Sequence, residues 1–196
     1  MREGLALTKG DALLIIDTQN DFVSGGALAV PQGDEVVPVL NRYIRIFQQH
    51  ELPIFATRDW HPPNHCSFQT QGGPWPVHCV VGSHGAEFIP SLQLPKTASI
   101  ISKPSDPAFE TYSGFQASGF EKQLRSAQIH RLFVGGLATD YCVLHTALDA
   151  LKHGFQVFLL KDAVRAVNVH PTDGAMAEKQ LVNAGAKPII VEQILS

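Results

Sequence analysis

The chain is poor in cysteine, and it lacks both long apolar runs and clusters of basic residues. Three cysteines do not make a disulfide framework, so we expect a reducing compartment, the cytoplasm. No apolar stretch approaches the ~20 residues that cross a bilayer, and residues 1–10 contain no hydrophobic core of a signal peptide. The formal net charge of −3 argues against nucleic acid or a membrane surface as a partner.

Apolar segments alternate along the chain between strand-like and helix-like patterns. The 196 residues are 44% hydrophobic, which suits one well-cored domain spanning 1–196. Alternating apolar strands and helices predict an α/β fold, with a parallel sheet covered by helices on both faces. The predicted strands are 12–16, 53–57, 99–102, 132–134, 155–160 and 187–191, and the predicted helices are 36–47, 139–152 and 172–184.

Polar residues follow these strands at the edge where parallel sheets bind ligands. The residues in question are Asp17, Arg58 with Asp59, Lys103, Thr139 to Cys142, and Lys161 with Asp162. If the strands are neighbours, Asp17, Lys103 and Cys142 converge. A thiol in the first turn of a helix lies in a field that favours thiolate. A carboxylate can take its proton and an ammonium can hold the anion.

Each of these three residues also has an ordinary interpretation. A free cysteine is usually inert and buried, and an aspartate at a strand end often only caps a turn. A single lysine is usually a solvated surface charge. The combination of Asp17, Lys103 and Cys142 is what favours catalysis.

Residues 59–97 form a long connection that is rich in proline, glycine and histidine, and we expect it to bind a metal. Asp59 and His61 are two residues apart, so extended backbone points both side chains the same way. His78 adds a second imidazole from the far part of the connection. One carboxylate and two imidazoles suit Zn²⁺ or Fe²⁺ and leave positions open for water or substrate.

Three other interpretations of this connection stay open. Cys66 and Cys79 could join His61 and His78 in a closed structural zinc site, although paired Cys-x-x-Cys spacing is missing. The same two cysteines could form a disulfide, which the expected compartment disfavours. The histidines could also simply hydrogen-bond the loop to itself.

Taken together, these motifs resemble the nicotinamidase branch of the isochorismatase-like cysteine hydrolase family. The resemblance covers nearly the whole chain, and it implies a three-layer α/β/α fold whose six-stranded parallel sheet has the order 3-2-1-4-5-6. It rests on the runs Ile15 to Phe22, Gly25 to Leu28, Thr57 to Pro62, Gly73 to Cys79, Lys103, Tyr112 to Phe115 and Gly136 to Val143.

The resemblance also implies a role for each site residue. Asp17, Lys103 and Cys142 match the catalytic triad. The metal ligands are matched by Asp59, His61 and His78, with His65 where some members have a further ligand. Substrate-binding positions are matched by Phe22, Trp75 and Tyr112, which line the nicotinamide pocket, and by Gln19, near the metal-bound waters. The Leu137–Ala138 peptide falls where the family has a cis bond, and the amides of Ala138 and Cys142 fall at the oxyanion hole.

We therefore expect hydrolysis of nicotinamide to nicotinate and ammonia through a thioester, a step of NAD salvage, with one divalent ion, Zn²⁺ or Fe²⁺, or Mn²⁺ as a further option. Relatives also accept pyrazinamide. Whether the chain forms a homo-oligomer stays open. The alternatives are a metal-free amidohydrolase of the same fold, acting on N-carbamoyl compounds or other small amides, and a non-catalytic zinc-binding member.

Overall fold

The structure is a computed structural model, and it describes residues 4–194. The chain alternates strands and helices as the apolar pattern predicts. The strands are β1 (Asp11–Ile16), β2 (Ile54–Arg58), β3 (Ser99–Ser102), β4 (Arg131–Leu137), β5 (Gln156–Arg165) and β6 (Lys187–Ile189). The helices are α1 (Val36–Gln49), α2 (Phe120–Ser126), α3 (Leu144–Lys152) and α4 (Asp173–Asn183).

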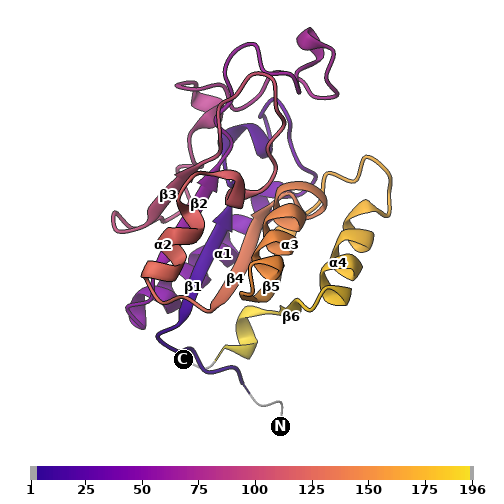
Figure 1. Ribbon diagram of the computed structural model, residues 1–196. Coiled ribbons are helices and arrows are strands. Elements are labelled where there is room, and N and C mark those ends of the chain that lie inside the picture. The colour runs from indigo at the N-terminus through magenta and orange to yellow at the C-terminus, as the bar shows by residue number, and fades with distance from the viewer. Residues whose placement is uncertain (1–3, 195–196) are drawn as a thin grey trace.

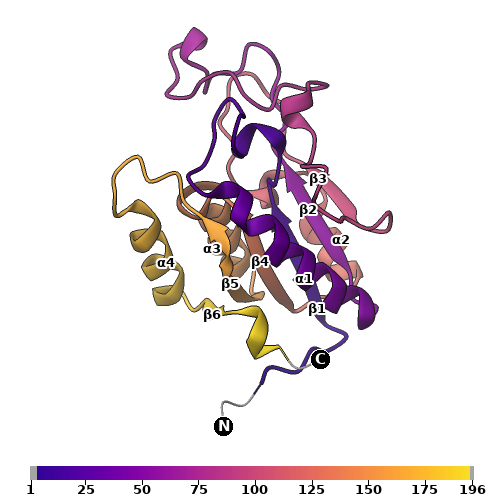
Figure 2. The same cartoon turned by 180° about the vertical axis from the view of Figure 1, so that it is seen from behind.

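All six strands lie in one parallel sheet with the order β3-β2-β1-β4-β5-β6, which confirms the predicted topology. Strand β1 is fully buried along its whole length because helices cover both faces. Helix α1 packs on one face, and α2, α3 and α4 cover the other (Figures 1 and 2). The result is a three-layer α/β/α arrangement in which β1 and β4 are central.

Several elements differ from the sequence prediction: β4 extends to Leu137, β6 ends at Ile189, and α3 begins only at Leu144, after a π-helical turn. Helix α2 was not predicted, because only Phe120 and Leu124 of its seven residues are buried and a helical stripe is hard to detect in so short a segment. Strand β5 continues to Arg165 instead of ending at Leu160. Asp162, which was predicted to follow this strand, therefore lies inside it, where its carboxylate accepts a hydrogen bond from the Tyr43 hydroxyl at 2.8 Å.

The end of β4 approaches β1 so closely that only glycine fits there. Gly136 has φ of +117°, and a Cβ atom built on it would lie 2.1 Å from the backbone oxygen of Ile16. The chain reaches Cys142 six residues later, at the carboxyl edge of the sheet. This close approach places the segment carrying Cys142 directly beside the end of β1.

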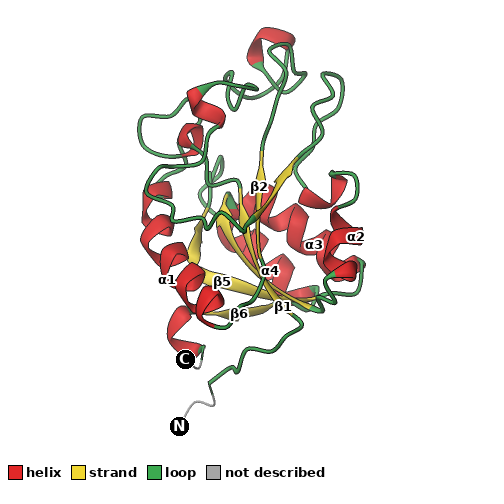
Figure 3. Cartoon of the chain, turned by 90° about the vertical axis from the view of Figure 1, so that its left-hand side faces the viewer, coloured by secondary structure: helices red, strands yellow, loops and turns green. Residues whose placement is uncertain are grey.

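The long connection after β2 rises above the carboxyl ends of the strands (Figure 3), at the opposite end of the molecule from the two termini (Figure 1). It contains two short 3-10 turns, Gln69–Gln71 and His84–Ala86, and otherwise irregular backbone. Between residues 4 and 194, no helix is long and apolar enough to cross a membrane.

Candidate active site and metal centre

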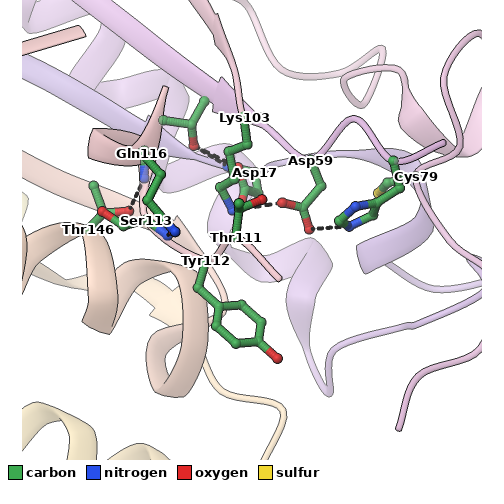
Figure 4. Close-up of polar contacts among 12 residues, drawn as sticks. Asp17, Asp59, Cys79, Lys103, Thr111, Tyr112, Ser113, Gln116 and Thr146 are labelled. Carbon is green, nitrogen blue, oxygen red and sulfur yellow. Dashed lines mark hydrogen bonds and ion pairs between the residues drawn. The ribbon is translucent and has the colours of Figure 1, made fainter. Parts of the chain in front are cut away.

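Asp17, Lys103 and Cys142 meet at the carboxyl edge of the sheet, although they are far apart in sequence. The Lys103 ammonium contacts the carboxylate of Asp17 and lies 2.7 Å from Oδ1 of Asp59 (Figure 4). A carboxylate oxygen of each aspartate and the Cys142 sulfur all lie within 4.8 Å of one another. Lys103 is only 2% exposed, which excludes the interpretation as a solvated surface charge.

The backbone around Asp17 explains how its carboxylate is aimed. Asp17 follows the last residue of β1 with φ of 41°, in the left-handed region, so the chain turns out of the sheet there. Its N–H donates to the backbone oxygen of Thr57 at 3.2 Å. The Thr57 hydroxyl donates back to Oδ1 of Asp17 at 2.6 Å, leaving Oδ2 for Lys103. Asp17 is thus fixed by β2, its neighbour in the sheet.

Burial and charge shift the pKa values of the two aspartates in opposite directions. Burial raises the pKa of Asp17, and the nearby negative charge of Asp59 adds to this effect, although Lys103 opposes it. Burial acts the same way on Asp59, but there the attraction of Lys103 and His61 outweighs it and lowers the pKa. One ammonium therefore keeps Asp59 ionised while Asp17 takes up a proton more readily than an ordinary aspartate.

Cys142 lies in a π-helical turn, Thr139–Val143, that precedes α3. The sequence predicted that a helix start would favour thiolate at this position. In the structure, burial raises the pKa of Cys142 well above its usual value, and Asp17 adds to this while Lys103 opposes it. Burial thus outweighs the attraction of Lys103 and favours the thiol form of the resting sulfur. The thiolate forms only if a neighbouring base accepts the proton.

Asp59, His61 and His78 also converge, and each offers one ligand atom within 4.8 Å of the others. Oδ2 of Asp59 lies 3.5 Å from Nε2 of His61. The other ring nitrogen, Nδ1 of His61, is the one side-chain nitrogen or oxygen among residues 4–194 that is buried without a hydrogen-bond partner. The carboxylate–imidazole donor set fits a divalent ion such as zinc or iron.

The ring of His78 is oriented for such a role, whereas that of His65 is engaged elsewhere. Nδ1 of His78 lies 2.8 Å from the backbone oxygen of Pro76, which holds the hydrogen on Nδ1 and leaves Nε2 as the acceptor. His65 is fully buried. Its Nδ1 lies 2.7 Å from the Ser67 hydroxyl, and its Nε2 lies 3.1 Å from the backbone oxygen of Phe109. Asp59, His61 and His78 thus form one candidate ligand set, and His65 lies with His61 and Glu110 in a second group whose potential ligand atoms are within 4.8 Å of one another.

All three cysteines are free, so the structure has no disulfide between Cys66 and Cys79. Cys79 is fully buried, and its sulfur lies 3.9 Å from the backbone oxygen of Gly85. No cluster of potential ligands within residues 4–194 includes either Cys66 or Cys79. A closed zinc site with these two thiols is therefore not formed.

A mainly apolar cavity borders Cys142, as is usual for sites that bind small molecules. The indole N–H of Trp75 donates to the Tyr112 hydroxyl at 3.2 Å, so two predicted pocket residues hold each other in place. The cavity is lined by Phe22, Leu28, Val30, Asp59, Trp75, His78, Glu110, Tyr112, Ala138, Tyr141, Cys142 and Val167.

The residues that line the cavity differ from the predicted set, because one predicted residue is absent and others that were not predicted are present. Gln19, which was expected to bind substrate, is fully buried and does not line the cavity. Tyr141 and Glu110 do line it but were not predicted. Tyr141 packs edge-on against Trp75 with ring centroids 5.1 Å apart. Its position directly before Cys142 was a signal that could have identified it, whereas nothing local marks Glu110.

The Leu137–Ala138 peptide is cis, as the resemblance implied. Ala138 and Cys142 both border the cavity. This places the residues expected to form the oxyanion hole on the same wall as the sulfur.

The comparisons with known proteins agree with this geometry. The isochorismatase domain family matches residues 11–193. The chain belongs to the isochorismatase family. The nicotinamidase of Escherichia coli (strain K12) is 42% identical over 196 residues, which cover 89% of this chain and 92% of that protein.

Solved structures of this family show the same fold. The pyrazinamidase of Pyrococcus horikoshii in complex with zinc is 49% identical with a TM-score of 0.88, and the match covers 92% of this chain and 99% of that one. PnC1 from L. infantum in complex with nicotinate is 36% identical with a TM-score of 0.89, and 98% of each chain is covered. The predicted family, fold and assignment as a hydrolase enzyme are confirmed.

Proposed function

We propose that this protein is a metal-dependent cysteine amidohydrolase that converts nicotinamide to nicotinate and ammonia. The observation that carries the proposal is the convergence of Asp17, Lys103 and Cys142 with a carboxylate–imidazole cluster on one aromatic cavity. The names of the relatives, nicotinamidase and pyrazinamidase, support the same class of aromatic amide. A cavity wall that includes Phe22, Trp75 and Tyr112 suits a flat heteroaromatic ring.

The first step is proton transfer from the Cys142 thiol to the Asp17 carboxylate. The raised pKa of Asp17 supports this step because it makes the carboxylate a stronger base, and the Lys103 ammonium offsets part of the cost of forming the thiolate. The sulfur then attacks the carboxamide carbon, and in this proposal the backbone N–H groups of Ala138 and Cys142 donate to the oxygen that becomes negative. Lys103 balances the negative charge of the cluster throughout.

Asp17 next returns its proton to the carboxamide nitrogen, and ammonia leaves. This step is demanding because an amide nitrogen is a poor leaving group unless it is protonated. The product is a thioester on Cys142. Asp17, again a carboxylate, accepts a proton from the water that hydrolyses this thioester, and nicotinate is released with the thiol restored.

Asp59, His61 and His78 would hold the divalent ion. When bound, the ion supplies a Lewis-acidic position for the pyridine nitrogen and so orients the ring. His65 is outside this ligand set in our proposal, since both of its ring nitrogens already have protein partners.

A metal-free amidohydrolase of the same fold is the main alternative. The convergence of Asp59, His61 and His78 argues against it, because a metal-free pocket has no need of that carboxylate–imidazole set. The buried Lys103 argues against a non-catalytic zinc-binding member. Burying an ammonium costs desolvation free energy, which a protein without a chemical role for the charge has no reason to bear.

The decisive experiment is ammonia release from nicotinamide, measured before and after the metal is stripped and after Zn²⁺, Fe²⁺ or Mn²⁺ is restored separately. We expect activity to disappear with the metal and to return with at least one of these ions. Elemental analysis of the purified protein runs in parallel. Full turnover by demonstrably metal-free protein would support the metal-free alternative, and absence of ammonia from any aromatic amide would defeat the proposal.

A further inference from the structure

Gln19 occupies a position among three of the loops that build the site, yet its side chain does not reach the cavity. Its Nε2 donates to the backbone oxygens of Asp59 at 2.8 Å and of Ala86 at 2.9 Å. Its Oε1 accepts from the backbone N–H of Asp59 at 2.8 Å. Both amide hydrogens and the amide oxygen are therefore used by backbone groups, and the side chain is fully buried.

Asp59 belongs both to the cluster with Asp17 and Lys103 and to the proposed metal site. It comes directly after β2, where the parallel pairing with β1 has ended. Its Oδ1 lies 2.7 Å from the Lys103 ammonium, and its Oδ2 lies 3.5 Å from Nε2 of His61. A small shift of the Asp59 backbone would move its carboxylate relative to both neighbours at once.

The Gln19 side chain replaces the missing strand neighbour at this point. A residue inside a sheet has its N–H and C=O bound by an adjacent strand, whereas Asp59 has both bound by one side-chain amide. The additional bond to Ala86 attaches the same amide to the far end of the long connection. Gln19 thus joins the end of β1 to both ends of the segment that carries the histidines.

We propose that Gln19 is a positioning residue that sets the metal affinity of the site by holding Asp59. This inference rests on the proposed function, in which Asp59 is a metal ligand. This positioning role replaces the predicted role of Gln19 in substrate binding, because both hydrogens of its amide are already donated to backbone oxygens. Groups that orient a metal ligand typically change affinity by 10–100-fold when they are removed.

The substitution Gln19→Glu tests the proposal with almost no change of shape. A carboxylate cannot donate to the oxygens of Asp59 and Ala86, so two bonds become repulsive contacts. Asn41 offers a matched control, since it makes the same kind of bridge far from the site: its Nδ2 donates to the Ser91 oxygen at 2.9 Å, and its Oδ1 accepts from the Gln93 N–H at 2.8 Å. The control variant is Asn41→Asp.

The measurement is Zn²⁺ affinity of the full chain, determined by competition with a chromogenic chelator, alongside the melting temperature of the metal-free protein. We expect Gln19→Glu to lose 10–100-fold in Zn²⁺ affinity, while Asn41→Asp stays within about threefold of the parent even if its melting temperature falls. Gln19→Met, which is apolar and similar in length, serves if the glutamate variant does not fold, and the same loss of affinity is expected.

Parental Zn²⁺ affinity in a folded Gln19 variant would overturn the positioning role while leaving the proposed function intact. A raised KM for nicotinamide with unchanged Zn²⁺ affinity would also overturn it and restore the role in substrate binding. An equal loss of affinity in Asn41→Asp would show a general effect of stability instead. If the parent protein binds no divalent ion, the metal assignment in the proposed function fails, and this inference fails with it.

Discussion

Lys103, Asp17 and Asp59 form a buried cluster in which one ammonium faces two carboxylates. A single positive charge cannot stabilise both negative charges in a medium of low polarity. The pKa directions follow from this imbalance: Asp59 stays ionised, and Asp17 binds a proton more readily than usual. At the residue scale, the site is therefore prepared to accept one proton, which is what activation of the Cys142 thiol requires.

The first prediction concerns Asp17. In an Asp17→Asn protein the amide can still contact the Thr57 hydroxyl, but it can neither take nor return a proton. We expect kcat for ammonia release to fall by more than ~10²-fold, the lower bound for general acid–base groups. The zinc content should equal that of the parent, because Asp17 is outside the proposed ligand set. Turnover within a few-fold of the parental rate would eliminate this role.

The second prediction separates two roles for His65. Because its Nε2 lies 3.1 Å from the Phe109 oxygen, we expect His65 to hold the wall that carries Glu110 and Tyr112. A His65→Gln protein should keep its Zn²⁺ affinity within about threefold, below the 10-fold effect of a group that orients a ligand, and should show a higher KM for nicotinamide. His78→Gln is the comparison and should lose most of its zinc. Equal zinc loss in both variants would instead identify His65 as a ligand.

At the scale of elements, a polar network deep in the α1 side of the sheet joins three segments. The Tyr43 hydroxyl on α1 donates to Oδ1 of Asp162 on β5 at 2.8 Å. Oδ2 of the same carboxylate accepts from the Val191 N–H, just after β6, at 3.0 Å. Tyr43 is fully buried, whereas Asp162 is partly exposed. The network orients α1 and the C-terminal segment against the sheet.

The third prediction therefore concerns stability alone. Tyr43→Phe should lower the free energy of unfolding by ~1–3 kcal/mol, because it removes the hydrogen bond from a buried side chain to a charged acceptor. Urea denaturation measures this change, and kcat should be unaffected. Arg42→Ala is the matched control. Arg42 joins α1 to the C-terminal segment through an exposed ion pair with Glu192 at 2.8 Å, so its removal should leave the urea midpoint nearly unchanged. A midpoint shift for Arg42→Ala as large as that for Tyr43→Phe would contradict the argument.

At the scale of the whole molecule, the proposed metal ion would join the long connection to the sheet. Two of the proposed ligands, His61 and His78, come from this connection, and Asp59 comes directly from the end of β2. A site that uses all three ligands can form only when the long connection is folded over the carboxyl edge of the sheet. Metal binding should therefore add to the stability of the folded chain.

The fourth prediction follows from this linkage. Zn²⁺ at about 100 times its dissociation constant should stabilise the parent by ~2.7 kcal/mol and raise the melting temperature in a concentration-dependent way. An Asp59→Asn protein should show a much smaller shift over the same range. Thermal denaturation across a Zn²⁺ titration provides the test, and an unchanged melting temperature at saturating Zn²⁺ would show that the ion does not bind preferentially to the folded chain.

The sequence by itself determined the strands and most helices, because apolar periodicity is a local property that follows from which faces are buried. The stripe from Val36 to Phe47 is an example, and α1 was predicted almost to its last residue. Helix α2 was missed because it is too short for periodicity to show. Motifs also identified Asp17, Lys103 and Cys142, although their convergence depended on the order of the strands.

Only the tertiary structure decided what each polar group contacts. The sequence could not show that Gln19 binds the backbone of Asp59, that both nitrogens of His65 are engaged, or that Glu110 lines the cavity. These contacts join residues 40 or more positions apart, or depend on irregular loop backbone. It also decided the protonation of Cys142, because burial and neighbouring charge set a pKa, and neither is defined until the chain has folded.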